Sequence, residues 1–493
     1  MAKKQWSWRR VASYGVAGGV GLALIPFAVP ITVLVYLVVW AYTWTHDQRA
    51  RSNLLGILPL HPRRVYQCAR ALWSGMLDGL GGPTLAIIVS YLAGKLTRSS
   101  RTQDTAVRDI KYGPAAGHRL DLFVPLAQGD GGGQLLPVVV VFPGYRWSKT
   151  KRARMYRPMA QTLCAAGRFV VLPRVGGKDA QVDDALCDFH AAVQWVFANA
   201  VNFGADPRRV HLLGYGAGAH LCMLYSLVVP LKTWYAQADR MAQDAQLMST
   251  RAADRRLRAW LGRIRRVARP VAGLVLVSGV FDLAAQRRYE ASRCIENVSA
   301  TARTFGALDL AAREDDAWSP AAIVRALRRR SAFIPAELFA QSVLLIHGQR
   351  DSTFVLAQSQ RMFRELCDVD VPRVDMKIYA NLRRVDPAIA LLAPGSPLAL
   401  SLLGDIGASL EKVREDEDGG RGRKQQQGRR DGEGEGQRES VRESSRAATE
   451  TRHSPASSAA SAETGDEGSG DYFAQRLAAS LDAPRRRVAI HSK

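Results

Sequence analysis

The residues closest to forming a chemical site are Gly214 to His220, which read Gly-Tyr-Gly-Ala-Gly-Ala-His. They lie between two mostly apolar runs, Val210–Leu213 and Leu221–Val229, so the sequence predicts a strand, a tight turn and a helix. Serine hydrolases hold their nucleophile in such a turn, as the serine of Gly-x-Ser-x-Gly. Both outer glycines are present, but position 216 is glycine. The pattern therefore predicts the backbone of a nucleophile site without the nucleophile.

Glycine at position 216 has a physical explanation. A nucleophile in this turn has a strained backbone, which costs about 1–3 kcal/mol, and glycine adopts a positive φ without a Cβ clash. The alternative interpretation of residues 214–220 is an ordinary glycine-rich turn that grips a phosphate at the start of the helix. The turn alone does not separate the two interpretations, whereas its flanking sequence favours the first.

Length and composition limit the classes of protein that fit. The chain has 493 residues, 47% of them hydrophobic, with a formal net charge of +23. The positive charge suggests a nucleic-acid-binding protein, but no nucleic-acid-binding motif accompanies it, so we favour a basic protein at a membrane surface. The six cysteines are far apart in the sequence. They are typical of buried thiols rather than a disulfide framework or a metal site, and we expect no metal, no cofactor and no nucleic acid.

The N-terminal region, residues 1–104, is predicted to be a membrane region. Val11–Trp44 contains 34 residues without a charge, more than the ~20 needed to span a bilayer. Basic residues flank this run, and tryptophans lie near both of its ends. A second apolar segment, 71–94, carries a single charge, Asp78. It fits a second span, a re-entrant hairpin, an amphipathic surface helix or a helix pair packed on the soluble domain.

Residues 105–410 are predicted to form an α/β domain, because short β-branched runs alternate with helical stretches. We expect a mostly parallel sheet flanked by helices. The expected strands are Leu120–Val124, Pro137–Phe142, Phe169–Pro173, Val210–Leu213, Leu274–Ser278, Val343–Ile346 and Met376–Tyr379. The expected helices are Ala153–Ala166, Asp183–Asn199, Ala217–Val229, Leu356–Leu366 and Pro397–Leu410.

Two further segments differ in composition. The stretch 231–270 is a basic helical insertion, which fits a cap over the site, a surface for anionic lipid headgroups or simply a solvated helix face. The stretch 411–493 is rich in Arg, Glu, Gly, Gln and Ser, so we expect a disordered tail.

The pieces between Asp109 and Leu410 together resemble the α/β-hydrolase fold. The motif that carries most of the resemblance is Gly-Ala-Asp-Pro-Arg-Arg-Val (204–210), followed by the turn and Ala-Gly-Ala-His (217–220). This stretch is similar to the carboxylesterase group that includes isoprenylcysteine methylesterases and kynurenine formamidases. Supporting motifs are Leu120-Asp121-Leu122, Asp188 with Trp195, Ser278-Gly279-Val280-Phe281-Asp282-Leu283, Ser319-Pro320 and His347-Gly348-Gln349-Arg350-Asp351.

The resemblance implies positions for a catalytic triad, in which a serine attacks, a histidine takes its proton and a carboxylate orients the histidine. The nucleophile position is Gly216 and the acid is Asp351. The base position, in the loop after Tyr379, is Arg384. Arginine stays protonated and cannot act as a general base. We expect Arg384 to form an ion pair with Asp351 beneath the Gly216 turn.

The resemblance also implies an oxyanion site, formed by Gly144, Tyr145 and the backbone of Ala217. The family's His-Gly-Gly-x-Trp is Pro143-Gly144-Tyr145-Arg146-Trp147 here, and proline has no N–H to donate. Two replacement nucleophiles are conceivable: Cys222, which the helical pattern places in the core, and Ser148. His220 matches a family histidine that supports the turn and is not the base.

Two functions follow. The first is a membrane-anchored protein of the carboxylesterase type that has lost hydrolysis and binds a hydrophobic ester, a lipid-like ligand or a protein partner. The second is an active esterase or methylesterase, with a non-standard nucleophile, acting on membrane-resident carboxylic esters. A nucleic-acid-associated protein is a third class, motivated by charge alone. For the first two we expect an integral membrane protein of the endoplasmic reticulum or another endomembrane.

Overall fold

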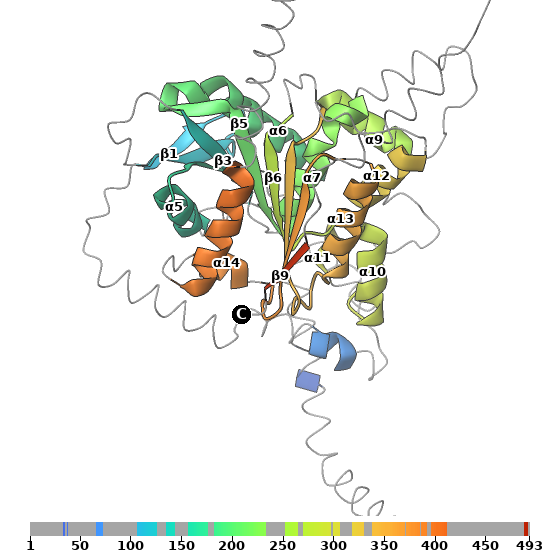
Figure 1. Cartoon of the computed structure of the whole chain (residues 1–493). Coiled ribbons are helices and arrows are strands. Elements are labelled where there is room, and N and C mark those ends of the chain that lie inside the picture. Colours follow the sequence, from blue (N-terminus) through green and yellow to red (C-terminus); the bar gives the residue numbers. More distant parts are fainter. Residues whose placement is uncertain are drawn as a thin grey trace, which may run out of the picture.

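The computed structural model of the chain describes most of the predicted α/β domain and short pieces of both terminal regions (Figure 1). The described residues are 33–34, 37, 66–71, 106–125, 135–142, 156–175, 182–232, 252–264, 270–296, 299–305, 318–329, 338–369, 371–384, 386–391, 396–411 and 488–491.

The described strands form one sheet in the order β1-β2-β4-β3-β5-β6-β7-β8-β9. Strand β2 pairs antiparallel with β1 and β4, and every other neighbouring pair is parallel. The strands are β1 (Ala106–Lys111), β2 (Arg119–Phe123), β3 (Leu136–Phe142), β4 (Phe169–Pro173), β5 (Ala205–Tyr215), β6 (Gly273–Val277), β7 (Ser342–Gly348), β8 (Val374–Tyr379) and β9 (Val488–His491). The predicted mostly parallel sheet is confirmed.

Helices cover both faces of this sheet (Figure 1). They are α5 (Arg157–Ala165), α6 (Val182–Asn199), η3 (Ala200–Phe203), α7 (Ala217–Ser226), α9 (Ala252–Arg263), α10 (Leu283–Ser292), α11 (Ala300–Phe305), α12 (Pro320–Arg329), α13 (Ala357–Asp368) and α14 (Asp386–Ala390). Residues 66–71, 228–232 and 397–411 are also helical.

Strand β3 shows why a continuous apolar run forms a central strand. Its side chains alternate between two cores, with Val138, Val140 and Phe142 on one face of the sheet and Val139 and Val141 on the other. Successive strand residues point to opposite faces, so both faces of a strand covered by helices must be apolar. The first core includes side chains of α6, α7, α12 and α13, and the second includes those of α5 and residues 397–411.

Three features differ from the sequence predictions. Strand β5 begins at Ala205, not Val210, because it pairs with β3 at Leu136↔Ala205 and resumes after an irregularity at Val138↔Val210. The edge strand β1 is mostly exposed and has no clear alternation. Strand β9 lies in the predicted disordered tail, yet pairs with β8 from Met376↔Val488 to Tyr379↔His491. The tail prediction is therefore wrong for residues 488–491, because a parallel pairing so distant in sequence leaves no local signal.

The predicted membrane segments fall almost wholly outside the described residues. Only residues 33–34 and 37 of the first segment and Ala71 of the second are described. Within the part of the chain that the structure describes, no helix has both the length and the apolar character needed to cross a membrane.

The described residues of the basic insertion are 231–232, 252–264 and 270, and its helix α9 packs on the domain. Trp260 and Leu261 are buried, and the Trp260 ring lies 5.8 Å from that of Trp318. Arg263 forms ion pairs with Asp183 and Asp184 in the first turn of α6. One side of this helix therefore belongs to the core, so a simple solvated helix face does not describe it.

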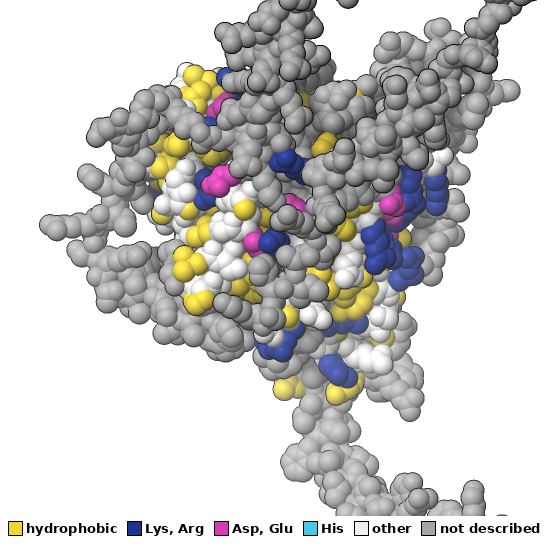
Figure 2. Space-filling model, viewed as in Figure 1, with side chains coloured by type: hydrophobic (Ala, Val, Ile, Leu, Met, Phe, Trp, Pro, Cys, Tyr) yellow, Lys and Arg dark blue, Asp and Glu magenta, His cyan; other side chains and the backbone are white. Residues whose placement is uncertain are grey.

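Basic side chains also gather on the side of the domain formed by α10, α12 and α13, where acidic side chains lie among them (Figure 2). Asp282 accepts ion pairs from Arg325 at 3.2 Å and Arg361 at 2.5 Å, and Arg328 pairs with Asp368. Much of the positive charge of these helices is therefore balanced locally.

The buried histidine of β5, His211, gives the domain a pH-dependent stability. Burial, with Arg209 and Arg168 nearby, lowers the pKa of His211 to about 3, and its Nε2 has no hydrogen-bond partner. An unfolded histidine takes up a proton near pH ~6.5, so the unfolded state binds more protons below this pH. The free energy of unfolding should fall as the pH is lowered from about 6.5, by up to ~1.4 kcal/mol per pH unit for this group.

We predict that His211→Leu makes this fall shallower by about one proton and costs little at neutral pH. The measurement is urea unfolding followed by tryptophan fluorescence between about pH 5 and pH 7. His220→Leu is the matched control, because it removes another buried imidazole but leaves the Trp318 carbonyl without its donor. Unlike His211→Leu, the variant His220→Leu should destabilise the domain at neutral pH. An unchanged slope in His211→Leu would show that this imidazole is already charged in the folded state.

Candidate active site

The predicted turn between strand and helix is present, with glycine at its apex. Strand β5 ends at Tyr215, Gly216 has φ 56° and ψ −115°, and α7 starts at Ala217. The Gly216 N–H donates to the Val277 carbonyl at 2.8 Å, and the Gly216 carbonyl accepts from the His220 N–H at 3.2 Å. This is the left-handed backbone that glycine tolerates and other residues adopt only under strain. The structure therefore has the nucleophile turn without a side chain at the nucleophile position.

Close packing around the turn explains two other residues of the motif, Gly214 and His220. A Cβ on Gly214 would lie 2.5 Å from the Ala219 Cα, so only glycine lets the helix approach the strand this closely. The His220 Nε2 lies 2.6 Å from the Trp318 carbonyl oxygen, to which it donates. Burial lowers the pKa of His220 to about 4, so this imidazole is neutral. His220 supports the turn, as predicted from the sequence.

Asp351 follows β7, and only one of its two carboxylate oxygens accepts hydrogen bonds. Its Oδ1 accepts from the Thr353 and Phe354 N–H groups, each at 2.9 Å. Its Oδ2 is buried and has no hydrogen-bond partner. Burial raises the pKa of Asp351, although His347 and Arg384 oppose the shift. In a catalytic triad this second oxygen accepts from the imidazole.

Arg384 lies near Asp351 but does not pair with it. Its Cζ is 4.4 Å from the centre of the Phe354 ring, and its carbonyl accepts from the Tyr215 hydroxyl. The structure describes both Arg384 and Asp351, and no ion pair joins them. The predicted Arg384–Asp351 ion pair is therefore wrong. The guanidinium instead stacks on an aromatic face and keeps some hydration, since joining a buried carboxylate would cost its desolvation.

His347 lies near Asp351, and both of its ring nitrogens form hydrogen bonds. Its Nε2 donates to the Phe354 carbonyl at 2.7 Å, and its Nδ1 accepts from the Ser359 hydroxyl at 2.7 Å. The Nε2 is 3.9 Å from the Asp351 Oδ2, too far for a hydrogen bond. Burial lowers the pKa of His347. This histidine fixes the loop that carries the acid and has no free nitrogen to act as a base.

Ser278 is a hydroxyl beside the turn that was not predicted to do chemistry. It follows β6 directly, has φ 48° and is fully buried. Its Oγ has no hydrogen-bond partner, while its N–H donates to the Ile346 carbonyl at 2.9 Å. The sequence signal that could have found it is its place after a strand that neighbours the turn, because the carboxyl ends of parallel strands share one edge.

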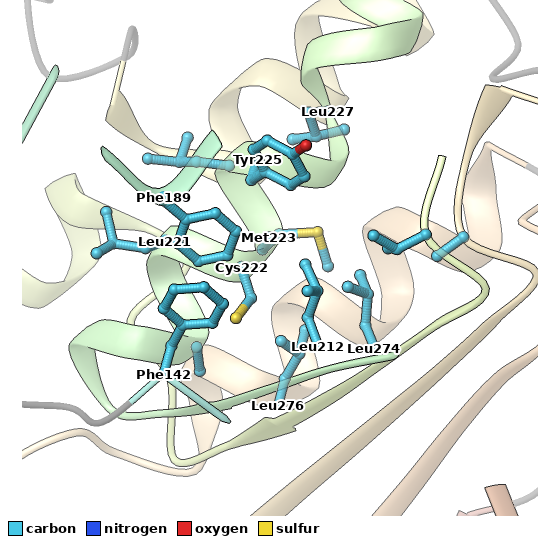
Figure 3. Packing of buried hydrophobic residues seen from close by; sticks show 14 of the residues in the cluster. Phe142, Phe189, Leu212, Leu221, Cys222, Met223, Tyr225, Leu227, Leu274 and Leu276 are labelled. Carbon is cyan, nitrogen blue, oxygen red and sulfur yellow. The ribbon is translucent and has the colours of Figure 1, made fainter. Parts of the chain in front are cut away.

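The remaining predicted residues divide into two groups. Cys222 is fully buried in the core beside Phe142 and Leu221 (Figure 3), and burial raises the pKa of its thiol well above the usual value. A buried neutral thiol is inert, so Cys222 is a core residue. Ala217 is the buried first residue of α7, in the position predicted for an oxyanion donor. Gly144, Tyr145 and Ser148 lie outside the described residues, so the oxyanion loop stays a prediction.

The sheet order, the glycine turn after β5 and the acid after β7 together define an α/β-hydrolase fold. Comparison with known proteins agrees with this class. The BD-FAE family model matches residues 120–260, and the solved structure of an inhibited esterase B from Lactobacillus rhamnosis is similar in fold. That similarity has a TM-score of 0.50 and 17% identity, over 70% of this chain and 99% of the other.

Two curated relatives narrow the class. Residues of this chain are 30% identical over 139 residues to isoprenylcysteine alpha-carbonyl methylesterase ICME of Arabidopsis thaliana, which is 28% of this chain and 29% of the relative. They are 29% identical over 147 residues to esterase LipQ of Mycobacterium tuberculosis (strain ATCC 25618 / H37Rv), 28% of this chain and 33% of the relative. The chain thus matches about a third of the length of these relatives. Over this stretch the chain is similar to carboxylesterases of the α/β-hydrolase superfamily.

The two buried aspartates at this end of the sheet should respond oppositely to loss of charge. In Asp351→Asn the Oδ1 acceptor is kept and an uncompensated buried carboxylate is removed. Because the folded pKa of Asp351 is raised, stability is lost as the pH rises from the unfolded carboxyl pKa of about 3.9 to the folded pKa, and the full cost remains at higher pH. We predict that Asp351→Asn has an unchanged or higher Tm at about pH 8, and that its advantage shrinks as the pH is lowered.

Asp282→Asn is the control for this prediction. Burial opposes ionisation of Asp282, but the Ala285 N–H and Arg361 hold its pKa below the usual value. Removing this charge breaks the pairs with Arg325 and Arg361 and should cost about 2 kcal/mol. Thermal unfolding of both variants tests the difference, and a clear destabilisation by Asp351→Asn at high pH would mean that its carboxylate is compensated.

Proposed function

We propose that this chain is a carboxylesterase-fold protein that binds a hydrophobic ester, a lipid-like ligand or a protein partner at the former active site, without serine-type hydrolysis. The observation that carries the proposal is Gly216 at the apex of a complete nucleophile turn. The fold keeps the backbone that would present a nucleophile and supplies no atom there to attack a carbonyl.

Two further observations support the loss of hydrolysis. A serine becomes nucleophilic only when an adjacent base takes its proton, and the base position holds Arg384, stacked on Phe354. The Asp351 oxygen that would orient a histidine has no partner. Nucleophile, base and the link between base and acid are therefore all missing, although the acid itself is in place.

The second candidate function is an active esterase or methylesterase with a non-standard nucleophile, acting on membrane-resident carboxylic esters. The names of the relatives, an isoprenylcysteine methylesterase and an esterase, favour it. Ser278 is its best nucleophile among the described residues, because its buried Oγ lies beside the turn without a partner. Against it, the nearby imidazoles His220 and His347 are engaged by hydrogen bonds.

The test is hydrolysis of a short-chain p-nitrophenyl ester by four proteins. We predict that the unmodified chain, Gly216→Ser and Arg384→His all turn over ester at the rate of buffer, because each lacks at least one triad group. The double variant Gly216→Ser with Arg384→His regains nucleophile and base beside the unpartnered Asp351 oxygen, and it should hydrolyse the ester weakly but measurably.

Ser278→Ala distinguishes the two candidate functions. If the unmodified chain hydrolyses the ester above buffer and Ser278→Ala abolishes the activity, the active esterase replaces our proposal. Circular dichroism and Tm of each variant establish that the comparison is between folded proteins.

We also propose that the chain is anchored in a membrane of the endoplasmic reticulum or another endomembrane by its N-terminal region. The uncharged run Val11–Trp44 supports this. The helical segment 66–71 supports a link between this region and the domain, because the Arg293 Nη2 donates to the Ala71 carbonyl at 3.2 Å.

Deleting residues 1–50 should move the protein from the membrane pellet to the supernatant after carbonate extraction. An equal-length deletion from 412–461, in the predicted tail, is the control and should leave the protein in the pellet. Recovery of the full chain in the supernatant without detergent would contradict the anchor.

A further inference from the structure

Two cysteines from distant parts of the sequence lie near the end of α10. Cys68 lies in the helical segment 66–71, and Cys294 lies two residues beyond the last residue of α10. The Cys294 Sγ donates to the Gln67 Oε1 at 3.0 Å. The thiol of Cys294 therefore points at the short helical segment that carries Cys68.

The backbone of Cys294 is unusual for a cysteine. Its φ is 57°, its N–H donates to the Ala291 carbonyl, and the next N–H, of Ile295, donates to the Glu290 carbonyl. This pair of bonds is a Schellman helix end, whose left-handed residue is usually glycine. Capping the helix would favour glycine here, so the strained cysteine is better explained by a role of its thiol.

The two thiols differ in accessibility. Cys68 is 1% exposed, whereas Cys294 is partly exposed. Burial raises the pKa of Cys68 to about 12, and the charges of Cys294 and Glu296 add to this shift. Reaction with an oxidant requires a thiolate that the oxidant can reach. Cys294 therefore meets the oxidant first, and Cys68 is the buried thiol held beside it.

We propose that Cys68 and Cys294 form a reversible disulfide that joins the N-terminal region to the α/β-hydrolase domain. With hydrogen peroxide as oxidant, the Cys294 thiolate attacks a peroxide oxygen, the O–O bond breaks, and Cys294 becomes a sulfenic acid as hydroxide leaves and takes a proton to form water. The Cys68 sulfur then attacks the Cys294 sulfur, and the S–OH bond breaks with loss of a second water. Two thiols lose two electrons and two protons, and one peroxide becomes two waters.

The bond would fix the N-terminal region beside the acid loop. Arg293, next to Cys294, donates to the carbonyl of Ser352, which follows Asp351. The Tyr289 hydroxyl donates to the same carbonyl at 2.7 Å. Oxidation would thus tie the segment preceding 71–94 to the part of the domain that holds the candidate site.

Peptide mapping of the full chain in detergent tests the proposal directly. The protein is treated with graded hydrogen peroxide, free thiols are blocked, and tryptic peptides are identified with and without reduction. Cleavage after arginine places Cys68 in peptide 65–70 and Cys294 in peptide 294–303. We expect these two peptides joined by a bond that dithiothreitol breaks.

Variants give the control. Cys294→Ser and Cys68→Ser should each abolish the joined peptide, whereas Cys187→Ser, at another partly exposed cysteine, should leave it unchanged. In Cys68→Ser, peroxide should carry Cys294 on to the sulfinic acid. The proposal is overturned if peroxide oxidises Cys294 in the unmodified chain without joining the two peptides, or if Cys294 is found bonded to another cysteine. Both readouts come from the unmodified protein, so they do not depend on the folding of any variant.

Discussion

The close approach of α7 to the end of β5 is the constraint on which the rest of the site depends. The chain must turn from strand to helix at Gly216, where φ is 56°. Gly214 lets the Ala219 backbone pack so close that a Cβ on residue 214 would clash with it. This packing buries all of α7 and sets the Gly216 N–H against the Val277 carbonyl. A serine at this position would have a strained backbone, which catalysis would justify, whereas glycine adopts the same geometry with less strain. The packing of α7 on β5 therefore requires the turn whether or not residue 216 is a nucleophile.

The surroundings of Asp351 also keep their shape without the catalytic groups. Asp351 keeps two backbone donors and a buried second oxygen without a partner, and the residue at the base position does not fill the gap. Arg384 stacks on Phe354 instead, since a hydrated guanidinium loses more on entering a buried site than a neutral imidazole would. The acid loop is held from behind by His347 and Tyr289. These contacts preserve the shape of the site independently of the catalytic groups, which suits a binding role.

Local patterns carried most of the prediction from sequence. The β-branched runs gave the buried strands, and the glycines of 214–218 gave the turn. Strands β9 and β1 were not predicted. The pairing of the four-residue strand β9 with β8 is decided by distant residues, and the mostly exposed β1 has no alternation of apolar and polar residues. The residues of the site, Gly216, Asp351 and Arg384, could be named from the family pattern. The contacts of these residues could not be predicted. Whether Arg384 pairs with Asp351 or stacks on Phe354 depends on desolvation, and the absence of a partner for the Ser278 hydroxyl depends on the tertiary structure.

The most direct test of the central claim is covalent labelling of the unmodified full chain by a fluorophosphonate probe, read by intact-protein mass spectrometry. Such a probe phosphonylates an activated serine and ignores unactivated hydroxyls. An active serine esterase labelled in parallel establishes that the probe is reactive. A turn with glycine at its apex and no free base predicts no adduct on this chain. A stoichiometric adduct, mapped to Ser278 or to any other residue, would contradict the account and identify the nucleophile.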